Sequence, residues 1–156
     1  MGEVKPIVLL LPLMLILFAV ASVVLAESKS NDGPYVDKEG DFSLTIAVSS
    51  TSLSQGEDII VEVTFKNLTG KRLEISHGTP LLVPFIVNSE IYQGLRIDVA
   101  VLSVLEIDEV IVDTWQIGSE LSRGEYELVA DAKFSLLSNP SQVICVVSNT
   151  IVLTVD

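Results

Sequence analysis

The side chains best suited to chemistry here are the one histidine and the one cysteine. His77 follows Ser76, and Cys145 lies in the apolar run Val143–Val147. A nucleophilic triad needs a serine or cysteine held beside a histidine, whereas a thiol among valines and isoleucine is expected to be a buried, inert core residue. Zinc sites use several His or Cys ligands, and two residues do not suffice. We therefore expect a loop histidine, a core cysteine, and neither catalysis nor metal binding at either.

Carboxylates supply the other candidate chemistry. Four occur close together, namely Glu106, Asp108, Glu109 and Asp113. Paired carboxylates can act as acid and base in a small hydrolase, and a loop of them can hold Ca²⁺. Hydrolysis requires a cleft that a strand pattern does not show, so solvated turn residues are the expectation. A second acidic stretch, residues 37–41, lacks the further ligands and closing Glu of a calcium loop. No metal or cofactor is predicted.

Asn67 is the glycosylation candidate. The triplet Asn67-Leu68-Thr69 is an N-glycosylation sequon in a turn-like position, which an exported protein could present to solvent. The triplet that begins at Asn139 is excluded because proline follows it.

Strand-like alternation runs through the chain after residue 41. Residues 42–49 and 59–66 alternate apolar and polar side chains, and so do residues 124–134, where only Val129 breaks the pattern. A period of two predicts strands with one buried face. Further strands are expected at 71–76, 95–107, 110–117, 143–147 and 150–155. In the strand from Leu95, the expected inward face is Leu95, Ile97, Val99 and Val101. Pro80 and Pro84 predict edge-type pairing for residues 77–94.

These strands predict an all-β fold. No stretch of 11 or more residues after the first 26 shows a helical stripe, and turns separate seven to nine short strands. That pattern favours a single antiparallel β-sandwich over residues 42–156. The roughly 130 residues after the first 26 can bury a sufficient core without covalent cross-links, which matters because one cysteine cannot form an internal disulfide.

The first 26 residues have the pattern of an export signal. A short start carrying Lys5 precedes the uncharged apolar run Ile7–Ala26, and small or modest residues at 24–26 predict cleavage after Ala26. The alternative is an uncleaved anchor, since twenty apolar residues can span a bilayer. Residues 27–41 then form a flexible polar leader. Either way the remainder is expected outside the cytoplasm, and only residues 1–26 would contact a membrane.

The net charge limits the kinds of partner that the chain is expected to bind. The net charge of −12 lies entirely in residues 27–156. Nucleic-acid binding relies on Lys and Arg at phosphates, so this excess of carboxylates opposes it. It also opposes adsorption to anionic lipid. Solubility is the simplest consequence of the charge.

Two stretches resemble bacterial and archaeal immunoglobulin-like domains. One comprises residues 54–71, and the other comprises Trp115 followed by residues 121–126, in which Gly124 and Tyr126 resemble the tyrosine corner. The order of these elements is similar to the intracellular proteinase inhibitor family over residues 54–130. The resemblance implies an immunoglobulin-like sandwich with Trp115, Gly124 and Tyr126 as fold-defining residues. It carries over no inhibitory residue.

The expected function is that of a non-enzymatic exported module that binds another protein or a cell-surface component. The alternatives are a structural subunit of a surface layer or filament, a proteinase-inhibitor-like protein and, last, a small hydrolase that uses the carboxylates of 106–113.

Overall fold

Nine β-strands form the part of the chain that the structure describes. The computed structural model describes residues 40–87 and 95–156, and contains no helix in these ranges. The strands are β1 (Phe42–Val48), β2 (Ser52–Leu53), β3 (Ile59–Asn67), β4 (Leu73–Ile86), β5 (Ile97–Leu105), β6 (Val110–Ile117), β7 (Gly124–Leu136), β8 (Asn139–Val147) and β9 (Ile151–Val155). The expected all-β fold is confirmed. The expected signal or anchor (1–26) and nearly all of the leader (27–41) lie outside the described residues.

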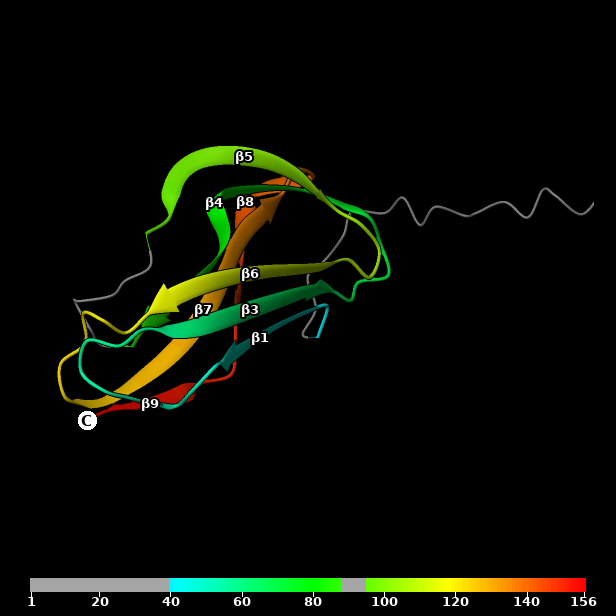
Figure 1. The fold of residues 1–156 in the computed structure, drawn as a ribbon. Helices are drawn as coiled ribbons and strands as arrows, with labels where there is room; N and C mark the ends of the chain where they lie inside the picture. The colour runs from blue at the N-terminus through cyan, green and yellow to red at the C-terminus, as the bar shows by residue number, and fades with distance from the viewer. Residues whose placement is uncertain (1–39, 88–94) are drawn as a thin grey trace, which may run out of the picture. The chain divides into compact units, whose positions relative to one another are not determined.

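The strands form two sheets (Figure 1). Sheet A has the order β1-β3-β6, and sheet B has the order β2-β9-β7-β4-β5, with β8 also paired to β7. Every pairing is antiparallel except that of β2 with β9. Labelled in the immunoglobulin manner, sheet A contains strands A, B and E, and sheet B contains strands C, F and G with β5 added beside C. This division of strands is that of an immunoglobulin-like sandwich.

The core is built from the inward faces of both sheets. In β3 every second residue is buried, and Val61, Val63 and Phe65 have no exposed surface. Phe65 packs edge-on against Phe134 of β7 with ring centroids 5.9 Å apart, and Phe42 of β1 packs edge-on against Phe134 at 5.1 Å. These contacts join the two sheets, and edge-to-face geometry is a preferred arrangement for aromatic pairs. The alternation expected for residues 42–49 and 59–66 is confirmed.

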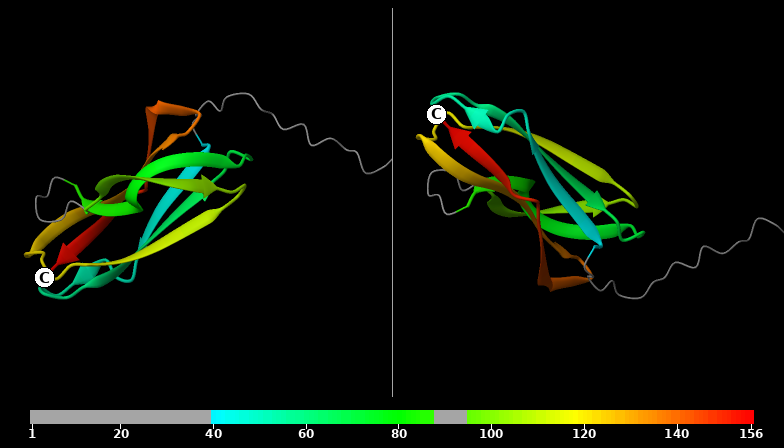
Figure 2. Two further views of the ribbon diagram at one scale, coloured as in Figure 1. Left: turned by 90° about the horizontal axis from the view of Figure 1, so that it is seen from above. Right: turned by 90° about the horizontal axis from the view of Figure 1, so that it is seen from below.

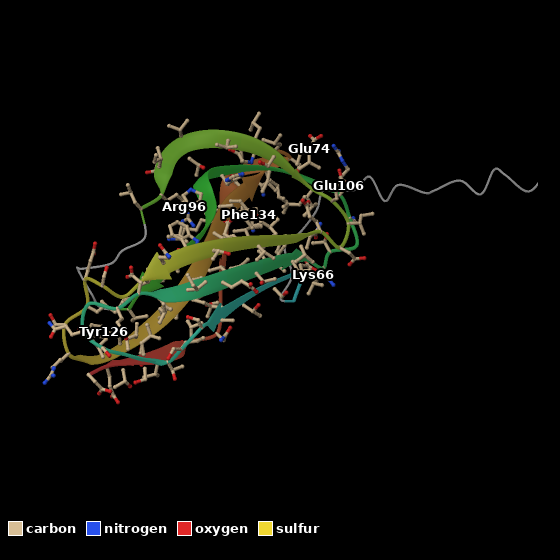
Figure 3. The ribbon with its side chains drawn as sticks, in the orientation of Figure 1. Lys66, Glu74, Arg96, Glu106, Tyr126 and Phe134 are labelled. Atoms are coloured by element: carbon tan, nitrogen blue, oxygen red, sulfur yellow. The ribbon has the colours of Figure 1, made fainter. Side chains whose placement is uncertain are left out.

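The entry to β7 has the geometry of a tyrosine corner. The Tyr126 hydroxyl donates a hydrogen bond of 2.8 Å to the carbonyl of Ser122, four residues upstream. Gly124 has φ +150°, a conformation that residues with a Cβ rarely adopt. Figure 3 shows Tyr126 at one end of the sandwich. The bond and the glycine together fix the direction in which the chain enters the central strand of sheet B.

Trp115 lies on β6, opposite Val61 of β3, and packs against the core. Its indole Nε1 is buried, and within residues 40–87 and 95–156 no hydrogen-bond partner meets it. Immunoglobulin domains place their characteristic tryptophan on strand C, in the other sheet. Trp115 therefore fills the core from a different strand.

The last strand of sheet B is interrupted so that it can reach sheet A. β8 pairs with the second half of β7 and β9 pairs with the first half, and Ser148–Thr150 separate them. The Asn149 side chain accepts a bond of 3.1 Å from the Ile46 N–H and donates one of 3.4 Å to the Ile46 carbonyl. Ile46 lies on β1, an edge strand of sheet A. One side chain thus satisfies backbone groups that the edge would leave unpaired.

Asn67 is a structural residue in the folded domain. It is fully buried, and Nδ2 donates to the carbonyls of Lys71 (2.9 Å) and Glu106 (2.8 Å). Oδ1 accepts from the N–H and the hydroxyl of Thr69. A glycan on Nδ2 would replace one of the two donated protons and needs space that a fully buried side chain lacks. The folded domain therefore argues against Asn67 as a glycan acceptor.

Two parts of the expected strand pattern need correction. Residues 50–58, which separate the first two expected strands, contain the additional short strand β2, which pairs with the last strand through Ser52 and Leu53. The prolines lie in β4, a central strand and not an edge strand. Pro84 is tolerated because the β4–β5 ladder runs only from Leu73 to Thr79, so the strand has no partner on its β5 side near Pro84. The missing N–H of proline is therefore not required there.

We expect Asn67→Asp to destabilise the domain by about 2–4 kcal/mol, because the buried carbonyls of Lys71 and Glu106 would both lose their donor. Asn139→Asp, a change of the same chemistry in a hairpin whose bonds are exposed, should cost less than about 0.5 kcal/mol. Urea unfolding followed by tryptophan fluorescence measures both. Equal stability of the two variants would contradict the structural role given to Asn67.

Candidate interaction surface

The structure places a serine, Ser103, beside the histidine but provides, in the part of the chain that it describes, no acid to complete a triad. His77 lies on β4, not in a loop, and is half-buried. Its Nδ1 is 2.6 Å from the Gly78 carbonyl, so Nδ1 carries the proton, and Nε2 is 2.9 Å from Ser103 Oγ on β5. The imidazole thus joins β4 to β5 and is fully engaged. Nothing in the described residues adds an acid that would complete a triad.

The core position expected for Cys145 is wrong, since Cys145 is exposed. It lies on β8 opposite Lys133 of β7, on the outer face of sheet B. Its neighbours Ile144 and Val146 take the inward positions. A period of two places alternate residues of an apolar run on opposite faces, and the apolar run alone did not show which face was buried.

The carboxylates of 106–113 do not form one site. Glu106, Asp108 and Glu109 belong to the turn between β5 and β6, where the Glu109 carboxylate accepts a 2.7 Å bond from the Glu106 N–H. Asp113 lies further along β6, opposite the buried Val63 and hence on the core-facing side. Within the described ranges, no group of three or more His, Cys, Asp or Glu could hold a metal ion. Glu106, Asp108 and Glu109 are therefore residues of the turn, and Asp113 is a residue of the strand β6.

The most unusual surface is the edge strand β5. Its exposed apolar side chains include Ile97 (54% exposed), Val99 (64%) and Leu102 (67%), and Leu95 just before it is 83% exposed. The expectation that Leu95, Ile97 and Val99 face the core is therefore wrong, and Val101 is half-buried. In Figure 1, β5 is the curved strand at the top of sheet B. The sheet thus ends in an apolar strand that is open to solvent.

A break in register explains why β5 turns away from the core. Leu105 to Val101 pair one by one with Leu73 to His77, but the next pair is Ile97 with Thr79. Two extra residues therefore lie on the β5 side of this interval. Extra residues bend a strand and increase its twist. The regular part, residues 101–105, follows the sheet, while the bulged part carries Ile97 and Val99 outward.

Arg96 holds the bulged end of β5 against sheet B. Its guanidinium donates to the carbonyls of Pro80 (3.2 Å), Leu81 (3.0 Å) and Asp131 (3.4 Å), and to Asp131 Oδ1 at 2.6 Å. The β4–β7 ladder is broken between His77 and Leu82, so carbonyls in this interval lack strand partners. Figure 3 places Arg96 at the start of β5. The planar guanidinium, with five donors, suits several acceptors at once.

Two features accommodate this arginine. Gly78 leaves room for its stem, because an added Cβ would stand 2.8 Å from Arg96 Cγ and Cδ. Asp131 balances its charge, and the two side chains are only 14% and 10% exposed. Lys133 approaches the other oxygen of Asp131 at 2.9 Å. The buried charge is therefore both paired and hydrogen-bonded, which is the condition for tolerating it.

Apart from β8, the other edges of the two sheets are better protected than β5. Asn149 bonds to β1, β2 is only two residues long, and β6 carries the inward carboxylate of Asp113. Short strands and inward charges are devices that prevent edge-to-edge association. β8, in the hairpin that projects from the sandwich in Figure 2, is uncharged like most of β5. Within β5 the one charged residue is Asp98.

We expect Asp131→Asn to cost about 2–4 kcal/mol, because it leaves the Arg96 charge largely buried without its counter-ion. The exposed pairs of Arg72 with Glu74 and Glu106 offer the control. Arg72→Gln should cost less than about 1 kcal/mol. Urea unfolding of both variants in low and high salt checks this, and a smaller loss for Asp131→Asn than for Arg72→Gln would refute the role of the buried pair.

No family model and no curated protein matches the chain. Solved structures with a similar fold include the CARDB domain of the PF1109 protein from Pyrococcus furiosus in complex with di-metal ions, at 18% identity over 74% of this chain and 88% of that chain, with a TM-score of 0.47. Its solution structure gives a TM-score of 0.48. The sporulation control protein Spo0M from Bacillus subtilis is 12% identical over 75% of this chain and 50% of that chain, with a TM-score of 0.47. The likeness to proteinase inhibitors stays a prediction.

Proposed function

We propose that the chain is an exported, non-enzymatic immunoglobulin-like module that binds another protein through the β5 edge of sheet B. The observation that carries the proposal is the exposed apolar strand itself. Its regular part, Val101–Leu105, is uncharged, and Leu102 is two-thirds exposed although it is paired with Ser76 of β4. Exposed, uncharged edges are aggregation hazards that proteins normally suppress, and the other edges of this domain are mostly suppressed.

Strand addition is the binding mode that fits this edge. In an antiparallel sheet, alternate residues of an edge strand direct their N–H and C=O groups away from the sheet. An extended segment can pair with those groups, while its side chains contact alternate side chains of the edge. At β5, Leu102 and Val104 would supply the apolar contact on the outer face. The role of the rest of the sandwich is to hold this strand in place.

A structural subunit is the second candidate, and a specific observation favours it. Sheet B ends in β5, whose one charged residue is Asp98, and in the uncharged β8, and the alternation of pairings makes these two strands antiparallel to each other. If β8 of one copy lay beside β5 of the next, it would continue the antiparallel sheet. Such a head-to-tail contact does not close, and it generates filaments. Val143 and Val147, 68% and 56% exposed, would lie at that contact.

Export is tested by the mass and location of the natural product. A chain that starts at Glu27 in the exterior soluble fraction is expected if the signal is cleaved, and a full-length chain in the membrane fraction is expected if it is an anchor. Mass spectrometry of fractionated cells distinguishes the two. A full-length chain in the cytoplasm would overturn the proposal of an exported module.

Binding at β5 is tested by cross-linking in the cells that produce the full chain. We expect a cross-linked product of defined mass, reduced at least about tenfold by Leu102→Lys, because the lysine places a charge in the contact. Val112→Lys, at a half-exposed position on the outer face of β6, is the matched control and should leave the product unchanged. Unfolding of each variant checks that stability changes by less than about 0.5 kcal/mol.

The mass of the product separates the candidates. A product that contains a second protein supports the binding module, and a ladder of multiples of the chain supports the structural subunit. Loss of the product in both variants, or in neither, would refute the placement of the contact at β5.

A further inference from the structure

The chemistry of the β5 partner follows from the charges at the two ends of the strand. On the proposed function of β5 as a strand-addition site, we infer that the partner is an extended protein segment with alternating apolar residues and Lys or Arg at both ends. The observation behind this is an uncharged stretch, Val101–Leu105, with exposed acidic residues before and after it.

The acidic residues lie on both sides of the regular ladder. Asp98 precedes it and is exposed, and Glu106 and Asp108 follow it and are exposed. The interval from Asp98 to Glu106 spans roughly 25 Å at the rise of a strand. An added strand lies about 4.8 Å from β5, so basic residues about eight positions apart would reach both groups of carboxylates.

The nearby cations offset only part of this charge, mainly at the end of β5 where Arg72 pairs with Glu106. Arg96 is directed into sheet B, where it binds Asp131 and three carbonyls. Arg72 bridges Glu74 and Glu106, which Figure 3 shows at the same end of the sandwich. The described residues contain 15 Asp and Glu against six Lys and Arg. A cationic segment is therefore attracted to the whole domain and to the ends of β5 in particular.

The same charge argues against the other occupants of this edge. A second copy brings its own excess of carboxylates to the contact, and like charges side by side cost binding energy. An acidic peptide meets Asp98 at one end and Asp108 at the other. An apolar segment without charges would be accepted, but nothing would set its position along β5. Basic residues at both ends supply attraction and fix the register.

The test uses the chain as the cell produces it and a synthetic peptide, KKTVTVTVKK, with a fluorescent label. At 50 mM NaCl we expect it to bind at least about tenfold more tightly than EETVTVTVEE, through a few exposed charge pairs. The difference should shrink towards none at 500 mM NaCl because salt screens exposed charges. A chain with Asp98→Asn and Asp108→Asn should lose most of the preference while it still binds.

Two further measurements locate the peptide. Leu102→Lys should abolish binding of KKTVTVTVKK, and Val112→Lys should not. A KKTVTVTVKK peptide that is N-methylated at the alternate residues whose N–H groups would face β5 should bind at least about tenfold more weakly. The methyl groups remove the N–H donors that would pair with the carbonyls of β5. Equal binding of the methylated and unmethylated peptides would overturn strand pairing.

The remaining outcomes separate this inference from the proposed function. If EETVTVTVEE binds as tightly as KKTVTVTVKK, with both lost in Leu102→Lys, the charge inference fails and β5 remains a strand-addition site. If neither peptide binds while the cross-linked product in cells still depends on Leu102, the inference of an extended segment fails. If sedimentation shows that the chain self-associates through Leu102, a second copy is the occupant and the cationic partner is overturned.

Discussion

The guanidinium of Arg96 is the interaction on which the shape of sheet B depends. Between His77 and Leu82 the inner strand β4 leaves its ladder with β7, and a fully regular sheet would have no such interval. Arg96 supplies the missing donors from the neighbouring strand, and Asp131 makes its charge tolerable at that depth. Besides this pair, β5 is held to β4 by the ladder from Val101 to Leu105, by the His77–Ser103 hydrogen bond and by the pairing of Ile97 with Thr79. The ion pair thus helps to position the proposed interaction surface, although it is not part of that surface.

The sequence predicted the strands well because period-two alternation reports burial on one face. It predicted β1, β3 and β7 almost to the residue, and it placed Tyr126 at a corner where its hydroxyl does bond upstream. It failed where alternation is ambiguous. In β5 and β8 apolar residues occupy both faces, so the pattern did not show that Ile97, Val99 and Cys145 are exposed.

The candidate site could not be predicted for a related reason. Whether a strand lies inside a sheet or at its edge is decided by pairing between segments that are distant in the sequence. The apolar residues of 95–105 are compatible with either position. The Arg96–Asp131 pair joins positions 35 residues apart, and nothing local to either residue indicates it. A charged residue among apolar ones, Asp131 in Leu128–Ala132, was the available signal that a buried partner had to exist.

The hydrogen bonds between Asn149 and Ile46 also affect when β1 can be completed during synthesis. Asn149 bonds to Ile46 across 103 residues, and strands β1 to β8 all precede it in the chain. A ribosome must therefore synthesise these eight strands before the first strand can be closed at its edge. Because such long-range contacts form late, partly synthesised chains would leave the edge of β1 unpaired and would depend on being kept apart until Asn149 emerges.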